Sequence, residues 1–356
     1  MRIVVAMSGG VDSSVAAALL AQEGHEVVGL SMQLYDQREG VNRFGSCCTL
    51  DDLHDARRVA AVIGIPHYIV NFERQFEDQV ISNFVREYSA GRTPIPCVHC
   101  NGDLKFRTLL TRAQGLNADF VATGHYARVE RAPRTGRYLL KRGVDPDKDQ
   151  SYFLFSLDQA QLAHAIFPLG QLRKADVRAC AHRLGLSVAD KPDSHEICFV
   201  ADGDHVGFIE RRAPALRQAG VISDLSGRVL GRHEGVHRFT VGQRKGLGLS
   251  STFPLYVVKI DADRNRVTVG PRDALGRAHV TVSGVNWIAC EPPSDPIRVD
   301  ARIRHRHREA SASVRAHDGH RAELQFDEPQ VAVAPGQAVV FYDGEDVVGG
   351  GWIEQP

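Results

Sequence analysis

Glycines and hydroxyl side chains gather near the start of the chain, between two apolar segments. Residues 3–7 form a short apolar run that predicts a buried strand, and the Ala- and Leu-rich residues 15–20 predict a helix. The turn between them reads Ser8-Gly9-Gly10-Val11-Asp12-Ser13-Ser14. The glycines let the backbone approach a ligand closely, and Ser13 and Ser14 stand where we expect the helix N-cap. Because the first amides of a helix attract negative charge, the turn predicts an anion site, most often one for phosphate.

Two cysteine-bearing stretches could supply a sulfur nucleophile. One reads Thr93-Pro94-Ile95-Pro96-Cys97-Val98-His99-Cys100-Asn101, and its two prolines predict a stiff loop that presents Cys97 and Cys100. A C-x-x-C pair alone is compatible with zinc, iron–sulfur or dithiol redox chemistry. In the other stretch, Cys198 follows a polar segment and precedes the apolar pair Phe199-Val200. It is therefore either a core residue or a reactive thiol at the edge of an element.

The glycine turn resembles the PP-loop of ATP pyrophosphatases, which cleave ATP between the α and β phosphates and adenylate a substrate oxygen. It lacks the Gly-Lys-Ser/Thr ending of a Walker loop, and it does not match G-x-G-x-x-G. The plain alternative is an ordinary turn between a strand and a helix, because such turns are often rich in glycine and serine. The position directly after the first apolar strand favours the PP-loop.

The elements that must position these residues alternate between strands and helices. In chain order the patterns predict a strand at 27–32, a helix capped by Thr49 and Asp52, a strand at 68–70, a helix over 76–85 and a strand at 120–124. Such alternation predicts a parallel sheet with helices on both faces, and ligands bind at the carboxyl ends of its strands. Met32, Gly124 and His125 stand at such ends, so we expect them to face one crevice together with the turn.

The pattern changes after residue 202. Residues 203–275 are rich in glycine and predict a small irregular α+β domain. Residues 276–356 form short alternating segments with hairpin dipeptides at Asp318-Gly319 and Asp343-Gly344, and they predict an antiparallel β-barrel. We therefore expect an α/β chain of three domains, with a doubly wound parallel sheet over residues 1–202.

Composition and charge narrow the functional classes. The 43 basic and 43 acidic residues give no net charge, so any nucleic-acid footprint must be local. No apolar run approaches the roughly 18 residues of a membrane helix, and the chain opens on a core strand rather than a signal peptide. Seven cysteines, an odd number, argue against a disulfide framework. We expect a cytoplasmic protein with reduced thiols and no membrane partner.

A series of motifs carries a resemblance over essentially the whole chain. The motifs are, in order, SGGVDSS, Thr93-Pro94 with Cys100-Asn101, Ala122-Thr123-Gly124-His125-Tyr126, Lys148-Asp149-Gln150-Ser151-Tyr152-Phe153, Ile197-Cys198-Phe199, Gly242-Gln243-Arg244-Lys245-Gly246-Leu247-Gly248 and Pro335-Gly336-Gln337. In these motifs the chain is similar to the bacterial tRNA-specific 2-thiouridylases. The resemblance implies ATP-dependent replacement of the C2 oxygen of the wobble uridine (position 34) of tRNA by sulfur.

The resemblance also implies roles for individual residues. Cys198 would carry a persulfide and Cys100 would be the catalytic cysteine, with a transient disulfide between them. ATP, with Mg²⁺, would be bound by the turn and by two strand ends, that is, by Ala6, Met7, Ser8, Gly9, Gly10, Val11, Asp12, Ser13, Met32 and Gly124. Contacts to tRNA would come from His125, Lys148, Asp149, Gln150, Arg304, His305 and Gln337. A persulfide-donating relay protein or a cysteine desulfurase would supply the sulfur.

This chemistry is consistent with the residue types. A urea-like carbonyl oxygen is a very poor leaving group, whereas adenylation turns it into AMP. Loop amides and Mg²⁺ can stabilise the departing pyrophosphate. The attacking sulfur must be nucleophilic at neutral pH, as a thiolate or persulfide is, and a second cysteine can release it by thiol–disulfide exchange.

One stretch departs from the family pattern. Where many members have Asn-Pro-Asp before the catalytic cysteine, at the site that touches the target base, this chain has Ile95-Pro96-Cys97. The base contact there cannot be a carboxylate. With Cys100 and Cys198, the extra thiol of Cys97 could hold an iron–sulfur cluster with one open iron, or it could compete as the resolving thiol.

A local basic row is the expected tRNA surface. Arg302, Arg304, Arg306 and Arg308 alternate with other residues, so on a strand they would lie on one face about 6.6 Å apart, a spacing that suits a phosphate backbone. The alternative is a solvated edge strand whose charges prevent aggregation.

Two rival functions remain open at the sequence level. Other PP-loop enzymes, such as amide- or argininosuccinate-forming ligases, need no reactive cysteine pair. A protein that only binds tRNA or metal through C-x-x-C would not consume ATP. Substitution of Cys100 or Cys198 by serine would leave such a ligase active but would inactivate a 2-thiouridylase. Substitution of Asp12 by alanine would have no effect on a protein that only binds tRNA or metal.

Overall fold

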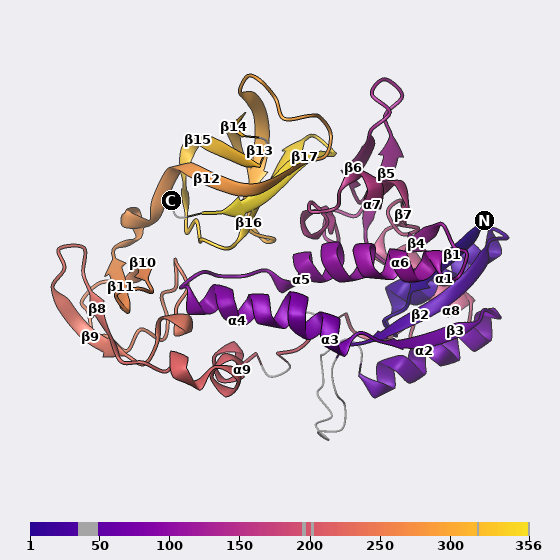
Figure 1. Cartoon of the computed structure of the whole chain (residues 1–356), viewed down its shortest axis with the longest axis horizontal. Coiled ribbons are helices and arrows are strands. Elements are labelled where there is room, and N and C mark those ends of the chain that lie inside the picture. Colours follow the sequence, from indigo (N-terminus) through magenta and orange to yellow (C-terminus); the bar gives the residue numbers. More distant parts are fainter. Residues whose placement is uncertain (35–48, 194–196, 201–202, 319, 355–356) are drawn as a thin grey trace. The chain divides into compact units, whose positions relative to one another are not determined.

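The computed structural model describes residues 1–34, 49–193, 197–200, 203–318 and 320–354 (Figure 1). The chain divides into two compact units. The first consists of Met1–Val80, Cys97–Gly203 and Glu345–Val347, and the second of Ile81–Pro96, Asp204–Gly344 and Val348–Pro356. Among the described residues, a hydrophobic cluster lies within the first unit, and other clusters lie within the second. Cys47 and Cys48 lie outside the described residues.

A five-stranded sheet forms the centre of the first unit. Its strands lie in the order β3-β2-β1-β4-β7, and all four neighbouring pairs are parallel. The strands are β1 (Arg2–Ala6), β2 (Glu26–Gln33), β3 (His67–Asn71), β4 (Phe120–Ala122) and β7 (Ala165–Ile166). This arrangement confirms the predicted parallel sheet, in which successive strands must be joined by crossovers.

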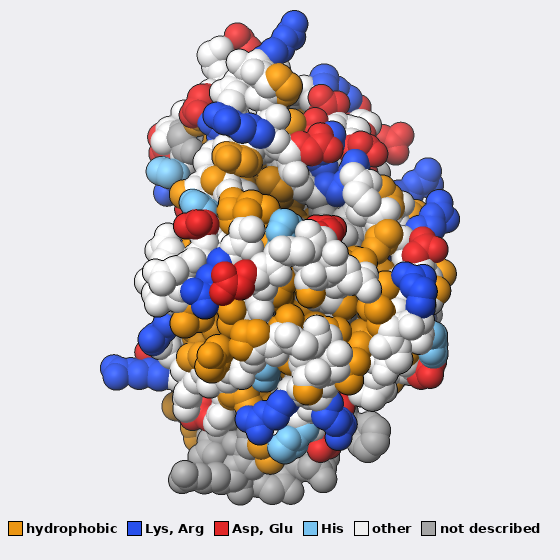
Figure 2. All heavy atoms as spheres, turned by 90° about the vertical axis from the view of Figure 1, so that its right-hand side faces the viewer, with side chains coloured by type: hydrophobic (Ala, Val, Ile, Leu, Met, Phe, Trp, Pro, Cys, Tyr) orange, Lys and Arg blue, Asp and Glu red, His pale blue; other side chains and the backbone are white. Residues whose placement is uncertain are grey.

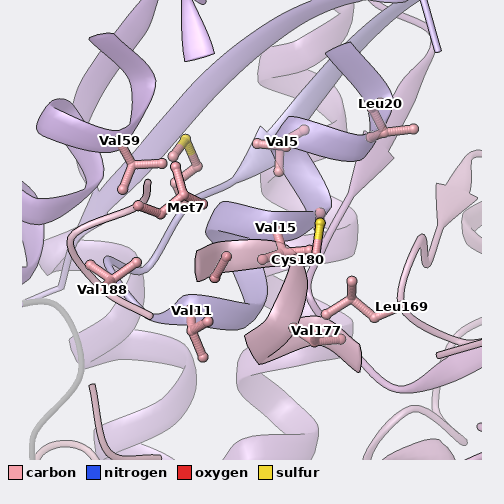
Figure 3. Close-up of a cluster of buried hydrophobic side chains, with 14 of the residues drawn as sticks. Val5, Met7, Val11, Val15, Leu20, Val59, Leu169, Val177, Cys180 and Val188 are labelled. Atoms are coloured by element: carbon pink, nitrogen blue, oxygen red, sulfur yellow. The ribbon is translucent and has the colours of Figure 1, made fainter. Parts of the chain in front are cut away.

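Helices and apolar side chains cover the sheet. Ile3 and Val5 of β1 belong to a cluster with side chains of α1 (Val11–Gln22), α2 (Leu50–Ile63) and α8 (Lys174–Arg183). Figure 3 shows Val5 among the members of this cluster. Val4 points to the other face and is also fully buried, so both faces of β1 are covered. The remaining helical segments of this unit are α3 (Glu73–Phe76), α5 (Pro96–His99), α6 (Leu109–Gln114), α7 (Gln159–Ala163), a 3₁₀ turn at Ser151–Phe153 and wide, π-type turns at Glu77–Ile81 and Cys100–Thr108.

The local predictions for this unit are confirmed at two points. Helix α2 has the expected capping box, in which the Thr49 side chain accepts from the Asp52 amide and the Asp52 side chain accepts from the Thr49 amide. The sequence also predicts a structural role for Cys180, on the helical pattern of Val177, Ala181 and Leu184, and Cys180 of α8 is buried in the core cluster. A hairpin of β5 (Ala127–Arg131) and β6 (Tyr138–Arg142) completes the unit.

The middle part of the chain forms a small mixed sheet in the second unit. The strand order is β10-β11-β8-β9, for β8 (Gly220–Ser223), β9 (Val229–His233), β10 (Tyr256–Asp261) and β11 (Arg266–Gly270). The helical segments of this part are α9 (His205–Arg212) and 3₁₀ turns at Pro214–Leu216, Val236–Arg238 and Arg272–Leu275. Helix α4 (Ser82–Ser89), from earlier in the chain, also belongs to the second unit. The predicted mixture of short helices and strands is therefore present.

The C-terminal part forms a closed antiparallel barrel, as predicted. Its strands follow the order β12-β15-β14-β13-β16-β17, and β17 pairs again with β12. They are β12 (Gly276–Trp287), β13 (Ile297–Arg302), β14 (Ala310–Ala316), β15 (Arg321–Val331), β16 (Ala338–Asp343) and β17 (Asp346–Ile353). Closure leaves few backbone groups unpaired at a sheet edge.

The predicted row of arginines on one strand face is wrong. Strand β13 ends at Arg302, and the chain then turns, with the His307 amide donating to the Arg304 carbonyl. An ion pair of 2.9 Å between Arg302 and Glu309 closes the turn. The alternating pattern of apolar and charged residues therefore extends beyond the strand. Ile303 is buried although it lies in the turn, so a buried apolar residue in this pattern does not prove that the strand continues.

Removal of the Phe341 ring from the barrel core is expected to lower the free energy of unfolding of the barrel by about 3–5 kcal/mol. Phe341 is fully buried and its ring centroid lies 6.0 Å from that of Trp287. Both tryptophans of the chain, Trp287 and Trp352, belong to barrel strands, so their fluorescence during urea unfolding reports on this part of the full-length protein. Val331→Ala, at a partly exposed position of β15, is the control, and a loss below about 1 kcal/mol in Phe341→Ala would contradict the packing described.

No helix among the described residues is long and apolar enough to cross a membrane. A cytoplasmic location remains a prediction.

Candidate active site

The turn after β1 exposes a set of backbone amides. Helix α1 begins at Val11, its N-cap Gly10 is extended, and no side chain caps this end. Among the described residues, the amides of residues 9–13 have no hydrogen-bond acceptor. Unpaired amides at the positive end of a helix can bind an anion, and the anion site expected from the sequence stays a prediction.

The two serines of the turn have a different role from the one predicted. Ser13 and Ser14 lie inside the first turn of α1 rather than at its N-cap, and both hydroxyls donate to the Gly10 carbonyl, at 3.2 and 2.8 Å. The Ser13 hydroxyl also accepts from the Ser8 amide at 3.1 Å. The hydroxyls therefore fold the loop onto itself, and the helix amides stay open because no side chain covers them.

Two glycines allow the loop to pack closely against its neighbours. Gly9 has a φ of +73°, and a Cβ there would lie 2.1 Å from the carbonyl oxygen of Asp52. A Cβ on Gly124, which follows β4, would lie 2.6 Å from the amide nitrogen of Ser13. Any larger residue at either position must displace backbone, so these glycines fix where the loop lies on the sheet.

Gly124→Ala is expected to lower the free energy of unfolding by about 1–3 kcal/mol, because the new methyl group overlaps the first turn of α1. Urea unfolding followed by far-UV circular dichroism would measure the loss. The control is Gly276→Ala, whose Cβ would meet its nearest neighbour at 3.4 Å. Equal stabilities of the two variants would show that Gly124 is not in steric contact with the loop.

Asp12 is held by a lysine and a tyrosine from distant parts of the chain. The ammonium of Lys174 lies 2.7 and 2.8 Å from the two carboxylate oxygens, and the Tyr126 hydroxyl donates to Asp12 at 2.8 Å. Burial, followed by the charge of Asp12, raises the pKa of Tyr126 well above its usual value, so this hydroxyl keeps its proton. The orientation of the Asp12 carboxylate beside the open amides is thus fixed by Lys174 and Tyr126.

Asp193 connects this cluster to the segment that precedes Cys198. Its carboxylate accepts from Lys148 at 2.7 Å and from Arg178 at 3.2 Å, and it pairs with Lys174 at 2.8 Å. Burial acts to raise the pKa of Asp193, but the hydrogen bonds from Lys148 and Lys174 outweigh it and lower the pKa to about 2. Asp193 is therefore ionised throughout the neutral range.

The pairing of Asp12 with Lys174 and Tyr126 was not predicted from the sequence. Lys174 lies on α8 and Tyr126 follows β4, each more than a hundred positions from Asp12 along the chain. Asp193 was not among the predicted site residues either. The crossovers of the parallel sheet bring such residues to one edge, which a motif search along the sequence cannot detect.

Cys97 and Cys100 lie on a helix and not on the predicted loop. Thr93, Pro94 and Ile95 have no regular secondary structure, but Pro96 starts helix α5, because proline fits the first helical position. Cys97 is exposed and Cys100 is half-buried. Cys100 also begins the wide, π-type turns that continue to Thr108. This geometry is rare in proteins, and where it occurs it is often at a functional site.

Hydrogen bonds connect the Cys100 helix to the anion site. The Asn101 side chain donates to the Phe153 carbonyl at 3.2 Å, and the Phe153 amide donates to the Gln150 carbonyl at 2.9 Å. The Gln150 side chain accepts from the Tyr126 amide at 3.0 Å, and Tyr126 donates to Asp12. The two predicted centres therefore share one hydrogen-bonded framework within the first unit.

Cys198 is half-buried and sits before two buried residues, Phe199 and Val200. The Phe199 ring packs edge-on against Phe76 of α3 at 5.6 Å, which fixes the chain on the carboxyl side of the cysteine. Residues 194–196, on the other side, lie outside the described residues.

The remaining ATP-site candidates and His125 lie near the strand ends. Met32 is buried near the end of β2, and Met7 is buried in the core cluster shown in Figure 3. His125 is half-buried, and its Nδ1 lies 2.7 Å from the Thr123 hydroxyl. Burial, followed by the charge of Lys105, lowers the pKa of His125 well below its usual value, so the ring is neutral at pH 7.

The predicted tRNA contacts have different surroundings. Arg304 and His305 are exposed in the turn after β13. Gln337 donates to the Thr93 carbonyl at 3.0 Å. Asp149 is buried and accepts from the Gly143 amide and from the amide and hydroxyl of Ser151. In the stretch that departs from the family pattern, Ile95 and Pro96 are buried whereas Cys97 is exposed.

A groove of about 800 Å³ lies elsewhere on the first unit. It is lined by Leu30, Tyr68, Ile69, Val70, Arg107, Thr108, Thr111, Arg112, Gly115 and Leu116. Figure 2 shows hydrophobic side chains on the surface of one face of the molecule. Tyr68 and Ile69, on the edge strand β3, are exposed hydrophobic residues of the first unit. None of the residues predicted for the site lines this groove.

The described residues contain no group of three or more His, Cys, Asp or Glu side chains placed to hold a metal ion. Cys97, Cys100 and Cys198 are all described, so they do not form such a group in this structure. An iron–sulfur cluster would require these thiols to approach one another.

Comparisons with known proteins assign the chain to a family. Family models match residues 1–202 (tRNA methyl transferase HUP domain), 207–271 (tRNA methyl transferase PRC-barrel domain) and 277–353 (aminomethyltransferase beta-barrel domain). A tRNA-specific 2-thiouridylase MnmA of Geotalea uraniireducens is 55% identical over 99% of this chain and 95% of its own length. Proteins of the same name from Geobacter metallireducens and Solibacter usitatus are each 53% identical over 99% of this chain, and over 96% and 99% of their own lengths. The chain belongs to the tRNA-specific 2-thiouridylase family.

Proposed function

We propose that this protein converts the wobble uridine of tRNA to 2-thiouridine, using ATP to activate the C2 oxygen and a persulfide on Cys198 as the sulfur source. The observation that supports it is the cradle of open amides at residues 9–13, joined by hydrogen bonds through Tyr126 and Gln150 to the helix of Cys100. An ATP site alone would fit many enzymes. Its connection to a cysteine-bearing helix favours sulfur transfer.

In the first step, the C2 oxygen of uridine attacks the α phosphorus of ATP and pyrophosphate leaves. The open amides and the positive end of α1 bind the phosphate oxygens and stabilise the charge that develops on pyrophosphate. The carboxylate of Asp12 is the type of oxygen ligand that Mg²⁺ accepts beside phosphates, so Asp12 would hold this ion. Mg²⁺ would supply charge neutralisation for the phosphates. Ala6 to Ser13, Met32 and Gly124 would form the nucleotide site.

In the second step, the outer sulfur of the Cys198 persulfide attacks C2 and AMP leaves with the original oxygen. The Cys100 thiolate then attacks the sulfur atom of Cys198 itself. The bond between the two persulfide sulfurs breaks, its electron pair goes to the sulfur on C2, and a disulfide forms between Cys100 and Cys198. A dithiol must reduce this disulfide before the next turnover, and a persulfide-donating protein or a cysteine desulfurase must reload Cys198.

The residues that hold tRNA belong to the same proposal. The exposed Arg304 and His305 would contact the phosphate backbone, and Gln337, His125, Lys148 and Gln150 would lie along the bound RNA. Because Asp149 is buried and binds Gly143 and Ser151, it would act by shaping this loop. Residues 1–202 would form the catalytic domain, 203–275 a central domain and 276–356 the barrel that grips tRNA. The target base would meet Ile95, Pro96 and Cys97.

The three cysteines raise a second possibility for the sulfur step. Cys97, Cys100 and Cys198 would ligate three irons of an iron–sulfur cluster and leave one iron open for sulfide. Purification without oxygen, followed by iron and sulfide analysis, decides between the two. Colourless, iron-free protein with full activity would exclude the cluster, whereas loss of iron and activity together in Cys97→Ser would support it.

The first test is tRNA-dependent formation of AMP and pyrophosphate from Mg·ATP by protein that has been loaded with a persulfide on Cys198. We expect AMP release only with tRNA that lacks the wobble thiolation. The names of the matching family models raise methyl transfer as an alternative, and a methyltransferase would need a methyl donor and would release no AMP. ATP cleavage that ignores tRNA would move the substrate elsewhere and favour a PP-loop ligase.

A further inference from the structure

Lys191 is bound to the PP-loop and to the first turns of α2 at the same time. Its ammonium donates to the Gly9 carbonyl at 3.0 Å, to Asp52 at 2.5 Å and to Asp55 at 2.6 Å. These four residues all belong to the first unit. An ammonium has three donors, and here each one meets an oxygen.

The Lys191 ammonium is charged under working conditions. Its side chain is 28% exposed, and those of Asp52 and Asp55 are only 10% and 15% exposed. Burial acts to lower the pKa of Lys191, but the hydrogen bonds to Asp52 and Asp55 outweigh it and raise the pKa. The contact with Gly9 is therefore a charge-assisted hydrogen bond, which is stronger than a bond between neutral groups.

This contact determines the direction of an amide in the anion site. In a trans peptide the carbonyl and the following N–H point in opposite directions, and no cis peptide is found among the described residues. With the Gly9 carbonyl held by Lys191, the Gly10 N–H must point away from Lys191. That N–H is one of the amides without an acceptor in the described part of the chain.

Asp52 prevents the Gly9 peptide from leaving this position. The Cβ that Gly9 lacks would lie 2.1 Å from the Asp52 carbonyl oxygen, so the loop already lies against α2. Asp52 is itself fixed, because its other carboxylate oxygen accepts from the amide and hydroxyl of Thr49 in the capping box. Lys191 is thus a rigid support for the glycine turn, supplied by the segment that leads to Cys198.

We propose that Lys191 is a positioning residue for ATP, which presets the Gly9–Gly10 peptide so that its amide faces the phosphates before the nucleotide arrives. This inference rests on the proposed function of the loop. A preset donor costs no reorganisation on binding, so removal of the support weakens nucleotide affinity. The residue acts through the backbone and needs no contact with ATP.

The test measures binding of Mg²⁺ with α,β-methylene-ATP, whose α–β bridge cannot be cleaved, by isothermal titration calorimetry on the full-length protein. Lys191→Met keeps the length of the side chain and removes its charge, and we expect it to bind about tenfold to hundredfold more weakly. Lys191→Arg keeps the charge and should recover most of the affinity. The matched control is Lys141→Met, because Lys141 also pairs with two carboxylates, those of Glu130 and Asp346.

The outcomes separate this inference from the proposed function. Wild-type protein that does not bind the analogue would overturn the use of ATP itself. Wild-type affinity in a folded Lys191→Met variant would overturn only the role of Lys191. If Lys191→Met does not fold, Asp55→Asn decides, because it removes one partner of the ammonium and leaves the Asp52 cap intact. We expect a loss of affinity of about threefold to tenfold in Asp55→Asn, and an unchanged affinity would overturn the inference.

Discussion

Replacement of Asp12 by asparagine is expected to reduce tRNA-dependent AMP release about a hundredfold to a thousandfold, the usual cost of removing one group that stabilises charge in a transition state. Asp12 lies within the segment of open amides, and hydrogen bonds from Lys174 and Tyr126 fix the orientation of its carboxylate. Asparagine keeps the shape but loses the charge that would hold Mg²⁺ and pair with Lys174. The rate of pyrophosphate release measures the effect.

Asp147→Asn is the matched control, because Asp147 is an exposed aspartate of the same unit. It should retain the wild-type rate. If Asp12→Asn retained it as well, the carboxylate would not take part in ATP chemistry, and a function in binding alone would be favoured. Circular dichroism of both variants shows whether a loss of rate reflects a loss of fold.

Replacement of Cys198 by serine is expected to abolish thiolation and to leave tRNA-dependent pyrophosphate release in the first turnover within about threefold of the wild-type rate. A serine hydroxyl cannot carry a persulfide, whereas adenylation uses the amides and Asp12. Because AMP leaves only when sulfur attacks C2, the variant should accumulate adenylated tRNA without forming thiolated uridine. Pyrophosphate release, measured beside mass spectrometry of the nucleosides, separates the two steps.

Cys290→Ser is the control for this experiment, since Cys290 packs against the core of the barrel. It should retain both activities. Thiolation by Cys198→Ser would assign the sulfur to another thiol, and Cys97 and Cys100 would be the next candidates. Loss of pyrophosphate release together with thiolation would mean that Cys198 supports the nucleotide site as well.

Periodicity and local motifs were sufficient for the overall architecture. The apolar runs at residues 3–7, 27–32 and 68–70 became neighbouring strands, and the Thr49–Asp52 cap started a helix as predicted. These features depend on residues close in sequence or on a repeating pattern, so the sequence alone contains them. The glycine turn was recognised for the same reason.

Two local errors show where such patterns are ambiguous. Alternating arginines predicted a longer strand, but the pairing of Arg302 with Glu309 turns the chain at the end of β13. Prolines predicted a loop around Cys97, but Pro96 is compatible with the first position of a helix. Alternation with a period of two does not show where a strand ends in a turn. Proline content does not show whether a proline interrupts a helix or begins one.

The supports of the site were beyond the reach of sequence reasoning. Lys174 and Lys191 reach the loop from elements far along the chain, and Asp193 pairs with Lys174. Lysine and aspartate are common on any surface. Their roles follow from the distances that the fold creates. Polar residues at the edge of a parallel sheet are therefore identified only when the crossovers are known.

The most direct measurement of the central claim is the fate of labelled sulfur. The protein would be loaded with a persulfide from a ³⁵S-labelled donor and incubated with Mg·ATP and tRNA that lacks the wobble thiolation, and the tRNA would be digested to nucleosides. The account predicts that label appears in 2-thiouridine derived from the wobble position, that this requires ATP, and that Cys198→Ser abolishes it. Label that stays on the protein while AMP accumulates, or a thiolated nucleoside formed without ATP, would contradict it.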